Sequence, residues 1–301
     1  MKDIQFYRSN PWYREDDISY LRIYDAQTDT ISDADVTDGL IEAPNWSKDG
    51  LSLYYNERGR MVRFDLESRE KTIIDSGFAD NCNNDHVLSP DGGRIAISHG
   101  SKEDGRSRVY TMPISGGVPK LITPLGPSYL HGWSPDGKTL AYCAERNGEF
   151  DIYAIPVDGG TEKKLTDSPG LNDGPEYSPD GKYIRYNSVR SGLMQIWKMK
   201  CDGSDAERIT FDDSRNCWFP HVSPDGRLVS YLAYRAGSIS PSEHLPHRRV
   251  EIMLMNSDGS VARPIRSLFG GQGTMNVNSW SPDSRRFAFV EYSIKGIGEL
   301  E

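Results

Sequence analysis

The sequence predicts an all-β fold, a six-bladed β-propeller of four-stranded antiparallel blades whose last blade is closed by the N-terminal strands. A short phrase, an apolar residue followed by Ser-Pro-Asp-Gly or a near copy, occurs six times along the 301 residues. Successive aspartates of the phrase lie 42, 45, 44, 45 and 58 residues apart, and a period of about 40–45 residues is typical of a propeller blade. These aspartates are Asp49, Asp91, Asp136, Asp180, Asp225 and Asp283.

The third repeat shows how one period would fold into a blade. Strands are expected over 128–134, 139–145, 150–157 and 162–166, with a tight turn at Pro135-Asp136-Gly137. Proline presets φ in such a turn, aspartate bonds back to the backbone, and glycine supplies positive φ. Strands this short bury little surface alone, so the core is expected to form where neighbouring blades stack.

The two ends of the chain predict how the ring closes. Only one further strand, 286–293, follows the sixth phrase, whereas 18–26 and 28–36 have strand character and no blade of their own. We therefore expect these two segments to complete the last blade. The chain is then one domain, 1–301, with blades at about 40–78, 79–124, 125–167, 168–211, 212–268, and 269–301 together with 15–36.

Composition predicts which kinds of partner the protein binds and where in the cell it is located. The net charge is −9 and no Lys or Arg run is present, so nucleic-acid binding is not expected, because it requires clustered cations. No apolar stretch has the length of a membrane span or of a signal-peptide core. Four cysteines without a CxxC pairing are typical of reduced thiols. We therefore expect no membrane partner and a cytoplasmic location, or a periplasmic one if a signal peptide has been removed.

The segments just before each phrase form the predicted functional face. In a propeller these segments lead into the innermost strands and surround one mouth of the central channel, opposite the Ser-Pro-Asp-Gly turns. They differ from one another and are rich in His, Asn, Asp, Gln and Trp, whereas the turns are nearly identical. The expected ligand-binding residues here are Glu42, Asn84, Asp85, Tyr129, Asn172, Asp173, Trp218, Gln272 and Asn276.

Histidines and one insertion add to this face. His86, His131 and His221 lie in the channel segments and are the expected catalytic residues. The 58-residue spacing places an insertion at 236–249, between strands two and three of blade five. We expect it to form a lid or rim with ligand-binding residues His244, His247 and Arg248. The alternative for both features is that a propeller places variable loops on this face whatever its function.

Three chemistries fit these residues. A divalent metal (Mn, Zn or Ca) would be held by His86, His131, His221 and Gln272, although no local spacing motif such as HExxH marks a metal site. Metal-free acid–base catalysis would use His with Arg or Asp as a partner. Simple binding would use amides and rings to hold sugar hydroxyls and C–H faces. No nucleotide cofactor is expected, because the glycine-rich stretch 270–273 precedes a strand rather than a helix.

The repeat also resembles a known family. The pattern WSPDGK…AY…R.G…DIYAI.VDGG…KLT, which begins at Trp133, is similar to the propeller repeat of TolB, the periplasmic protein of the Tol envelope system. The resemblance covers essentially the whole chain and implies the six-bladed fold. Unlike TolB, the sequence as given is expected to have no signal sequence and no separate N-terminal α/β domain. A more distant likeness to oligogalacturonate lyases, which hold a divalent cation with His and Gln, favours the metal hypothesis.

Two functions remain open at this stage. The first is a protein that binds, and processes as a lyase, epimerase or hydrolase, a small saccharide or sugar acid at the axial channel. The second is a TolB-like protein–protein interaction module without catalytic activity. Converging polar groups deep at the axis would favour the first, and exposed apolar or charged patches on the rim would favour the second.

Overall fold

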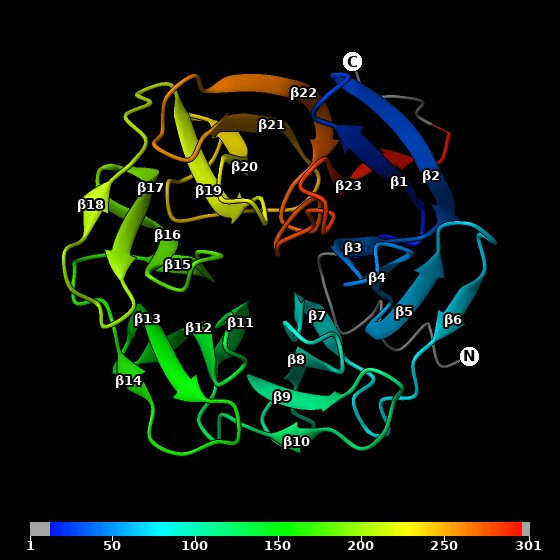
Figure 1. The fold of residues 1–301 in the computed structure, drawn as a ribbon, viewed down its shortest axis with the longest axis horizontal. Helices are drawn as coiled ribbons and strands as arrows, with labels where there is room; N and C mark the ends of the chain where they lie inside the picture. The colour runs from blue at the N-terminus through cyan, green and yellow to red at the C-terminus, as the bar shows by residue number, and fades with distance from the viewer. Residues whose placement is uncertain (1–12, 297–301) are drawn as a thin grey trace.

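The chain forms a six-bladed ring around a central axis, as predicted (Figure 1). The computed structural model describes residues 13–296. None of the elements in this range is an apolar helix of membrane-spanning length.

The first three blades are four-stranded antiparallel sheets, and each runs in sequence order from the axis outward. Their strands are β3 (Ile41–Trp46), β4 (Ser52–Glu57), β5 (Arg60–Asp65) and β6 (Lys71–Ile73); β7 (Cys82–Leu88), β8 (Arg94–Gly100), β9 (Ser107–Pro113) and β10 (Lys120–Leu121); and β11 (Ser128–Trp133), β12 (Thr139–Arg146), β13 (Glu149–Pro156) and β14 (Lys163–Lys164).

The fourth and fifth blades repeat this arrangement, so the predicted period describes five complete sheets. Their strands are β15 (Asn172–Tyr177), β16 (Tyr183–Ser191), β17 (Leu193–Lys200) and β18 (Glu207–Arg208); and β19 (Arg215–Val222), β20 (Leu228–Arg235), β21 (Arg248–Asn256) and β22 (Arg263–Gly270).

The sixth blade joins both ends of the chain. β1 (Asp17–Asp25) pairs along its whole length with β23 (Arg286–Ile294), and β2 (Thr30–Asp38) lies outside β1. In Figure 1 the blue β1 and β2 accordingly lie beside the red β23. The innermost position is occupied by the segment before Trp280, which forms a bridge to Phe287. The predicted closure of the last blade by the N-terminal strands is confirmed.

The six repeated phrases form six copies of one turn. In the third copy the Ser134 hydroxyl donates to Asp136 Oδ1 at 2.6 Å and accepts the Thr139 amide at 2.9 Å. Gly137 has φ +73° and donates its amide to the Ser134 carbonyl at 2.8 Å. The Ser–Asp bond recurs in every copy at 2.5–2.7 Å, so the phrase is a self-sufficient turn that needs no ligand.

The apolar residue of each phrase packs between blades. Trp46 and Trp133 are both buried, and each carries an arginine from the preceding blade over its ring. The guanidinium of Arg286 lies 5.0 Å from the Trp46 ring centre, and that of Arg94 lies 5.2 Å from the Trp133 ring centre. Stacked cation–aromatic contacts therefore link neighbouring blades.

Candidate functional site

A cavity of about 610 Å³ lies at the mouth of the channel opposite the repeated turns. The innermost strands of several blades and the blade-five insertion supply its walls. Nine of the residues expected at this face line it: Glu42, Asn84, Asp85, Tyr129, His131, Asp173, His244, Gln272 and Asn276.

One sequence offset accounts for most of these positions. The residue seven places before the aspartate of each turn lines the cavity in five of the six blades. Trp218, at the same offset in blade five, is fully buried behind the wall, with its ring centre 4.7 Å from that of His244. The five lining residues are Glu42, Asn84, Tyr129, Asp173 and Asn276.

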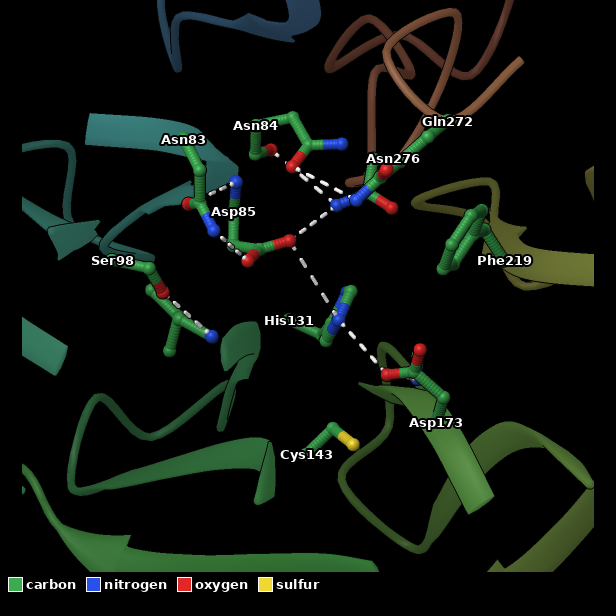
Figure 2. Close-up of polar contacts among 12 residues, drawn as sticks. Asn83, Asn84, Asp85, Ser98, His131, Cys143, Asp173, Phe219, Gln272 and Asn276 are labelled. Atoms are coloured by element: carbon green, nitrogen blue, oxygen red, sulfur yellow. Dashed lines mark hydrogen bonds and ion pairs between the residues drawn. The ribbon is translucent and has the colours of Figure 1, made fainter. Parts of the chain in front are cut away.

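His131 is the centre of the polar groups in the cavity (Figure 2). Its Nε2 lies 3.2 Å from Asp173 Oδ1 and 3.8 Å from Asp85 Oδ1. The ring stacks on Phe219 with a centroid separation of 5.7 Å. Burial alone would lower the pKa of His131, but the contact with Asp173 and the charge of Asp85 outweigh it, so the pKa lies above its ordinary value. The two carboxyls therefore favour the protonated form of the imidazole.

The two carboxyls beside His131 have opposite character. Burial raises the pKa of Asp85 to about 6, and the nearby charge of Asp173 adds to that effect. Burial would also raise the pKa of Asp173, but His131 and the Gly174 amide at 2.7 Å outweigh it and hold this pKa below its ordinary value. Two carboxyls whose pKa values are pushed apart are the signature of an acid–base pair.

Asp85 is held by amides rather than by a cation. The Asn83 side chain donates to Oδ2 at 2.6 Å, and the Asn276 side chain donates to Oδ1 at 2.5 Å (Figure 2). The 3.8 Å gap to His131 exceeds hydrogen-bond range. The two amides therefore fix the orientation of the Asp85 carboxyl, and Asp173 is the carboxyl closer to the His131 imidazole.

Glu42, on β3 of the blade next to that of Asp85, is a second buried acidic group in the cavity wall. Its Oε2 accepts the Tyr13 hydroxyl at 2.6 Å and the Asn56 amide at 2.9 Å. Burial raises the pKa of Glu42 to about 7. The cavity thus contains two carboxyls that titrate close to neutrality.

The insertion forms part of the cavity wall, in the place expected for a lid or rim. It occupies 236–247, because β21 already begins at Arg248, and its residues 242–246 line the cavity. His244 Nε2 lies 3.6 Å from Asp173 Oδ2, and burial lowers the pKa of this imidazole. The Tyr234 hydroxyl donates to the Leu245 carbonyl at 2.9 Å, and His247 Nε2 lies 2.8 Å from Asp17 on β1. The insertion is therefore fixed to two blades.

Two of the three expected catalytic histidines lie away from the cavity. His86 is fully buried, neither ring nitrogen has a hydrogen-bond partner among the described residues, and burial lowers its pKa to about 4. His221 Nδ1 lies 2.7 Å from Glu176 Oε2, and its Nε2 lies 3.3 Å from the Met275 carbonyl. Neither lines the cavity, so of the three only His131 is placed to contact a ligand there.

Irregular pairing in the innermost strands explains this difference. In β11 the bulge lies between Leu130 and Gly132, so His131 itself is the unpaired residue. In β7 the bulge covers 83–85, and His86 returns to regular pairing with Ile97. A bulge re-aims side chains beside a site, so His131 and Asp85 face the cavity although His86 has the same offset as His131.

Four expected ligand-binding or wall residues serve other contacts. Asn172 donates its amide to Asp151 at 3.0 Å, His247 anchors the insertion, and Trp218 supports His244. Arg248 donates to the His247 carbonyl at 3.0 Å. None of these four lines the cavity.

The residues present do not fit the expected metal set. Of His86, His131, His221 and Gln272, only His131 and Gln272 line the cavity. Within residues 13–296 no group of three or more His, Cys, Asp or Glu side chains is arranged to hold a metal ion. We therefore derive no chemical step through a metal.

Apart from Tyr129, the apolar and aromatic residues that line the cavity were not among the expected site residues. Phe219 has φ +54° and lies in the bulge of β19, between Trp218 and His221. A phenylalanine in the left-handed region marks a locally constrained backbone, but only the structure shows which residue of the segment bulges. Tyr13 and Phe150 also line the cavity and lie outside the channel segments, so the repeat gave no signal for them.

Fold and site together define a six-bladed propeller with a buried imidazole and carboxyl cluster at one mouth. The TolB β-propeller domain family matches residues 127–245. An uncharacterised protein of Agrobacterium fabrum is 47% identical over 277 residues, which cover 91% of this chain and 92% of that protein. A solved TolB-like structure from Agrobacterium tumefaciens is 45% identical, covers 92% of this chain and 99% of its own, and has a TM-score of 0.88. The chain belongs to the TolB-like β-propeller family.

More distant matches agree at the level of the fold. TolB from Acinetobacter baumannii is 21% identical over 89% of this chain and 68% of its own, with a TM-score of 0.68. The expected likeness to oligogalacturonate lyases is also present: one in complex with manganese is 13% identical over 83% of this chain and 67% of its own, with a TM-score of 0.51.

Proposed function

We propose that this propeller binds a small saccharide in the mouth cavity and processes it by acid–base chemistry centred on His131. One observation carries the proposal: His131 Nε2 lies between a carboxyl of lowered pKa, Asp173, and a carboxyl of raised pKa, Asp85. A cavity of about 610 Å³ also falls within the usual range for a small-molecule site.

In this proposal each group has a distinct role. Asp173, whose ionised form is favoured, favours the cationic form of His131. Asp85, with a pKa of about 6, exchanges a proton with a ligand hydroxyl or an acidic C–H near neutral pH. The imidazolium stabilises the negative charge that develops on the ligand. A lyase, an epimerase and a hydrolase share this proton-transfer requirement.

The test is saturation-transfer NMR with a panel of neutral sugars, sugar acids and amino sugars, followed by proton spectra after long incubation. His131→Ala is expected to lower turnover of a binding sugar by about 100-fold or more. Asp136→Asn, on the opposite face, is the matched control and should keep full turnover. If no sugar in the panel binds, or if His131→Ala retains full turnover, the proposal fails.

A protein-interaction role is the second candidate, and exposed apolar side chains favour it. Val118, Phe211 and Val261 are each more than 70% exposed, at the turns and strand ends of the outer blade edges. They lie in three different parts of the ring, so each is tested separately. If Phe211 belongs to a docking surface, chemical cross-linking in cells should capture a partner that Phe211→Lys loses and His131→Ala retains. Capture that is lost in His131→Ala instead would place the partner at the cavity.

A further inference from the structure

The charged side chains of the cavity wall are mostly acidic. Four carboxyls line it, from Glu42, Asp85, Asp173 and Glu243, together with the imidazoles of His131 and His244. Among the described residues that line the cavity, none is Lys or Arg. A ligand that carries a carboxylate would therefore meet no fixed cation other than an imidazolium.

Asp85 and Glu42 accept hydrogen bonds from neutral side chains, and the imidazole of His131 lies 3.8 Å from Asp85, beyond hydrogen-bond range. The closest imidazole contact, that of His131, belongs to Asp173. Asp85 accepts from the side chains of Asn83 and Asn276, and Glu42 accepts from those of Tyr13 and Asn56. Asp85 is 3% exposed and Glu42 is 9% exposed. An ionised carboxylate is costly at such depth unless a cation accompanies it.

Two buried amide groups in the same wall have an atom without a hydrogen-bond partner among the described residues. Asn84 is 2% exposed and lines the cavity, and its Nδ2 has no hydrogen-bond partner within residues 13–296. Asn276 is 1% exposed, and its Oδ1 likewise lacks a partner in that range. These amides lie together beside Asp85, and Gln272 adjoins them (Figure 2). Buried polar groups normally have partners, so this donor and this acceptor are suited to ligand hydroxyls.

Aromatic rings in the cavity wall also favour the binding of a cation. Tyr13, Tyr129 and Phe150 line the cavity, and ring faces attract ammonium groups as well as sugar C–H faces. A ligand with one ammonium and several hydroxyls satisfies the carboxyls, the amides and the rings together.

We propose that the cavity selects an amine-bearing polyol of the amino-sugar class over the neutral sugar and over the sugar acid, with Asp85 as the ammonium partner. The proposal rests on the function proposed above and specifies the charge of its ligand. Burial makes Asp85 costly to ionise and raises its pKa to about 6, and an ammonium beside it would offset that cost and favour the ionised form.

Three matched probes test the selection: D-glucosamine, D-glucose and D-glucuronate, titrated into the full chain at neutral pH by calorimetry. D-Glucosamine should bind about 10- to 100-fold more tightly than D-glucose, and D-glucuronate should bind more weakly than either. Asp85→Asn should reduce the preference for the amine to about twofold or less. Asp180→Asn, which removes a turn carboxylate, should keep the preference.

The outcomes separate this inference from the proposed function. If D-glucose or D-glucuronate binds as tightly as D-glucosamine, the charge selection is wrong while saccharide binding stands. If none of the three binds, the charge selection fails, and the proposed function fails as well only if no other sugar of the wider panel binds. Should Asp85→Asn not fold, as judged by circular dichroism, Glu42→Gln replaces it and should also weaken the preference for the amine. A preference unchanged in a folded Asp85→Asn protein would overturn the role of that carboxylate.

Discussion

The two faces of the ring hold carboxyls of opposite character. On the turn face, Asp136 and its five counterparts accept short bonds from a neighbouring serine, and each has a pKa held below its ordinary value. At the channel mouth, Glu42 and Asp85 are buried, and their pKa values are raised to about 7 and about 6. The same functional group thus stabilises the fold on one face and is costly to ionise on the other.

This difference separates structure from function within one repeat. A turn aspartate gains stability from its local contacts, so the same residue suits every blade. A carboxyl at the channel mouth contributes little to the stability of the fold. Its burial lowers the free energy of unfolding whenever the group is ionised. Residues that cost stability are expected at functional sites, which supports a ligand-binding role for the mouth.

The largest expected effect is the pH dependence of Glu42→Gln. Tyr13 and Asn56 both donate to one oxygen, Oε2, so an amide oxygen in that place keeps both bonds. The pKa of Glu42 rises on folding from 4.5 to about 7. Its contribution to stability is therefore fully present below pH 4.5 and is lost as the pH rises towards 7. Relative to the wild type, Glu42→Gln should gain about 3 kcal/mol of unfolding free energy over that interval.

Urea unfolding of both proteins at several pH values between 4.5 and 8 measures this gain. Asp136→Asn is the control, because a group with a lowered pKa contributes stability above its ordinary value of 3.8 and loses it only in acid. A constant difference between wild type and Glu42→Gln would show that Glu42 is not buried as an uncompensated acid.

A smaller effect is expected from Ser134→Ala on the turn face. The hydroxyl both donates to Asp136 and accepts the Thr139 amide, so its loss should cost about 1–2 kcal/mol of unfolding free energy. The same titration with D-glucosamine should give an unchanged affinity. Lost affinity at unchanged stability would mean that the turn face, rather than the mouth, serves the ligand.

The smallest effect is expected for a carboxylate that lies neither in a repeated turn nor at the channel mouth. Asp158 lies 3.4 Å from Lys120 on the outer edge, and its side chain is 80% exposed. Exposed pairs contribute little, so Asp158→Asn should leave both the denaturation midpoint and the D-glucosamine affinity unchanged. A clear loss of either would mean that charge alone, and not burial or turn geometry, sets the importance of a carboxylate.

Much of this arrangement could be predicted from the sequence because it repeats. The turn phrase predicted the blades, and the strands left over at the N-terminus predicted the closure. The segments before each turn predicted eight of the twenty residues that line the cavity. These features depend on the spacing of the repeated phrase along the chain, which can be read from one sequence.

The contrast between His131 and His86 could not be predicted in this way. Both lie five residues before the aspartate of their turn, yet only His131 is the bulged residue of its strand. The position of a bulge depends on how neighbouring blades pack at the axis. The conformation of the insertion depends likewise on its contacts with Tyr234 and Asp17, which no repeat specifies.

The most direct test of the central contrast is a carboxyl ¹³C NMR titration of the protein labelled at aspartate. Asp85 should titrate with a pKa of about 6, and Asp136 should titrate below its ordinary value of 3.8. Assignment follows from the loss of one signal in Asp85→Asn and of another in Asp136→Asn. If Asp85 titrates together with the turn aspartates below 3.8, the mouth carboxyls are not tuned for acid–base work and the account is contradicted.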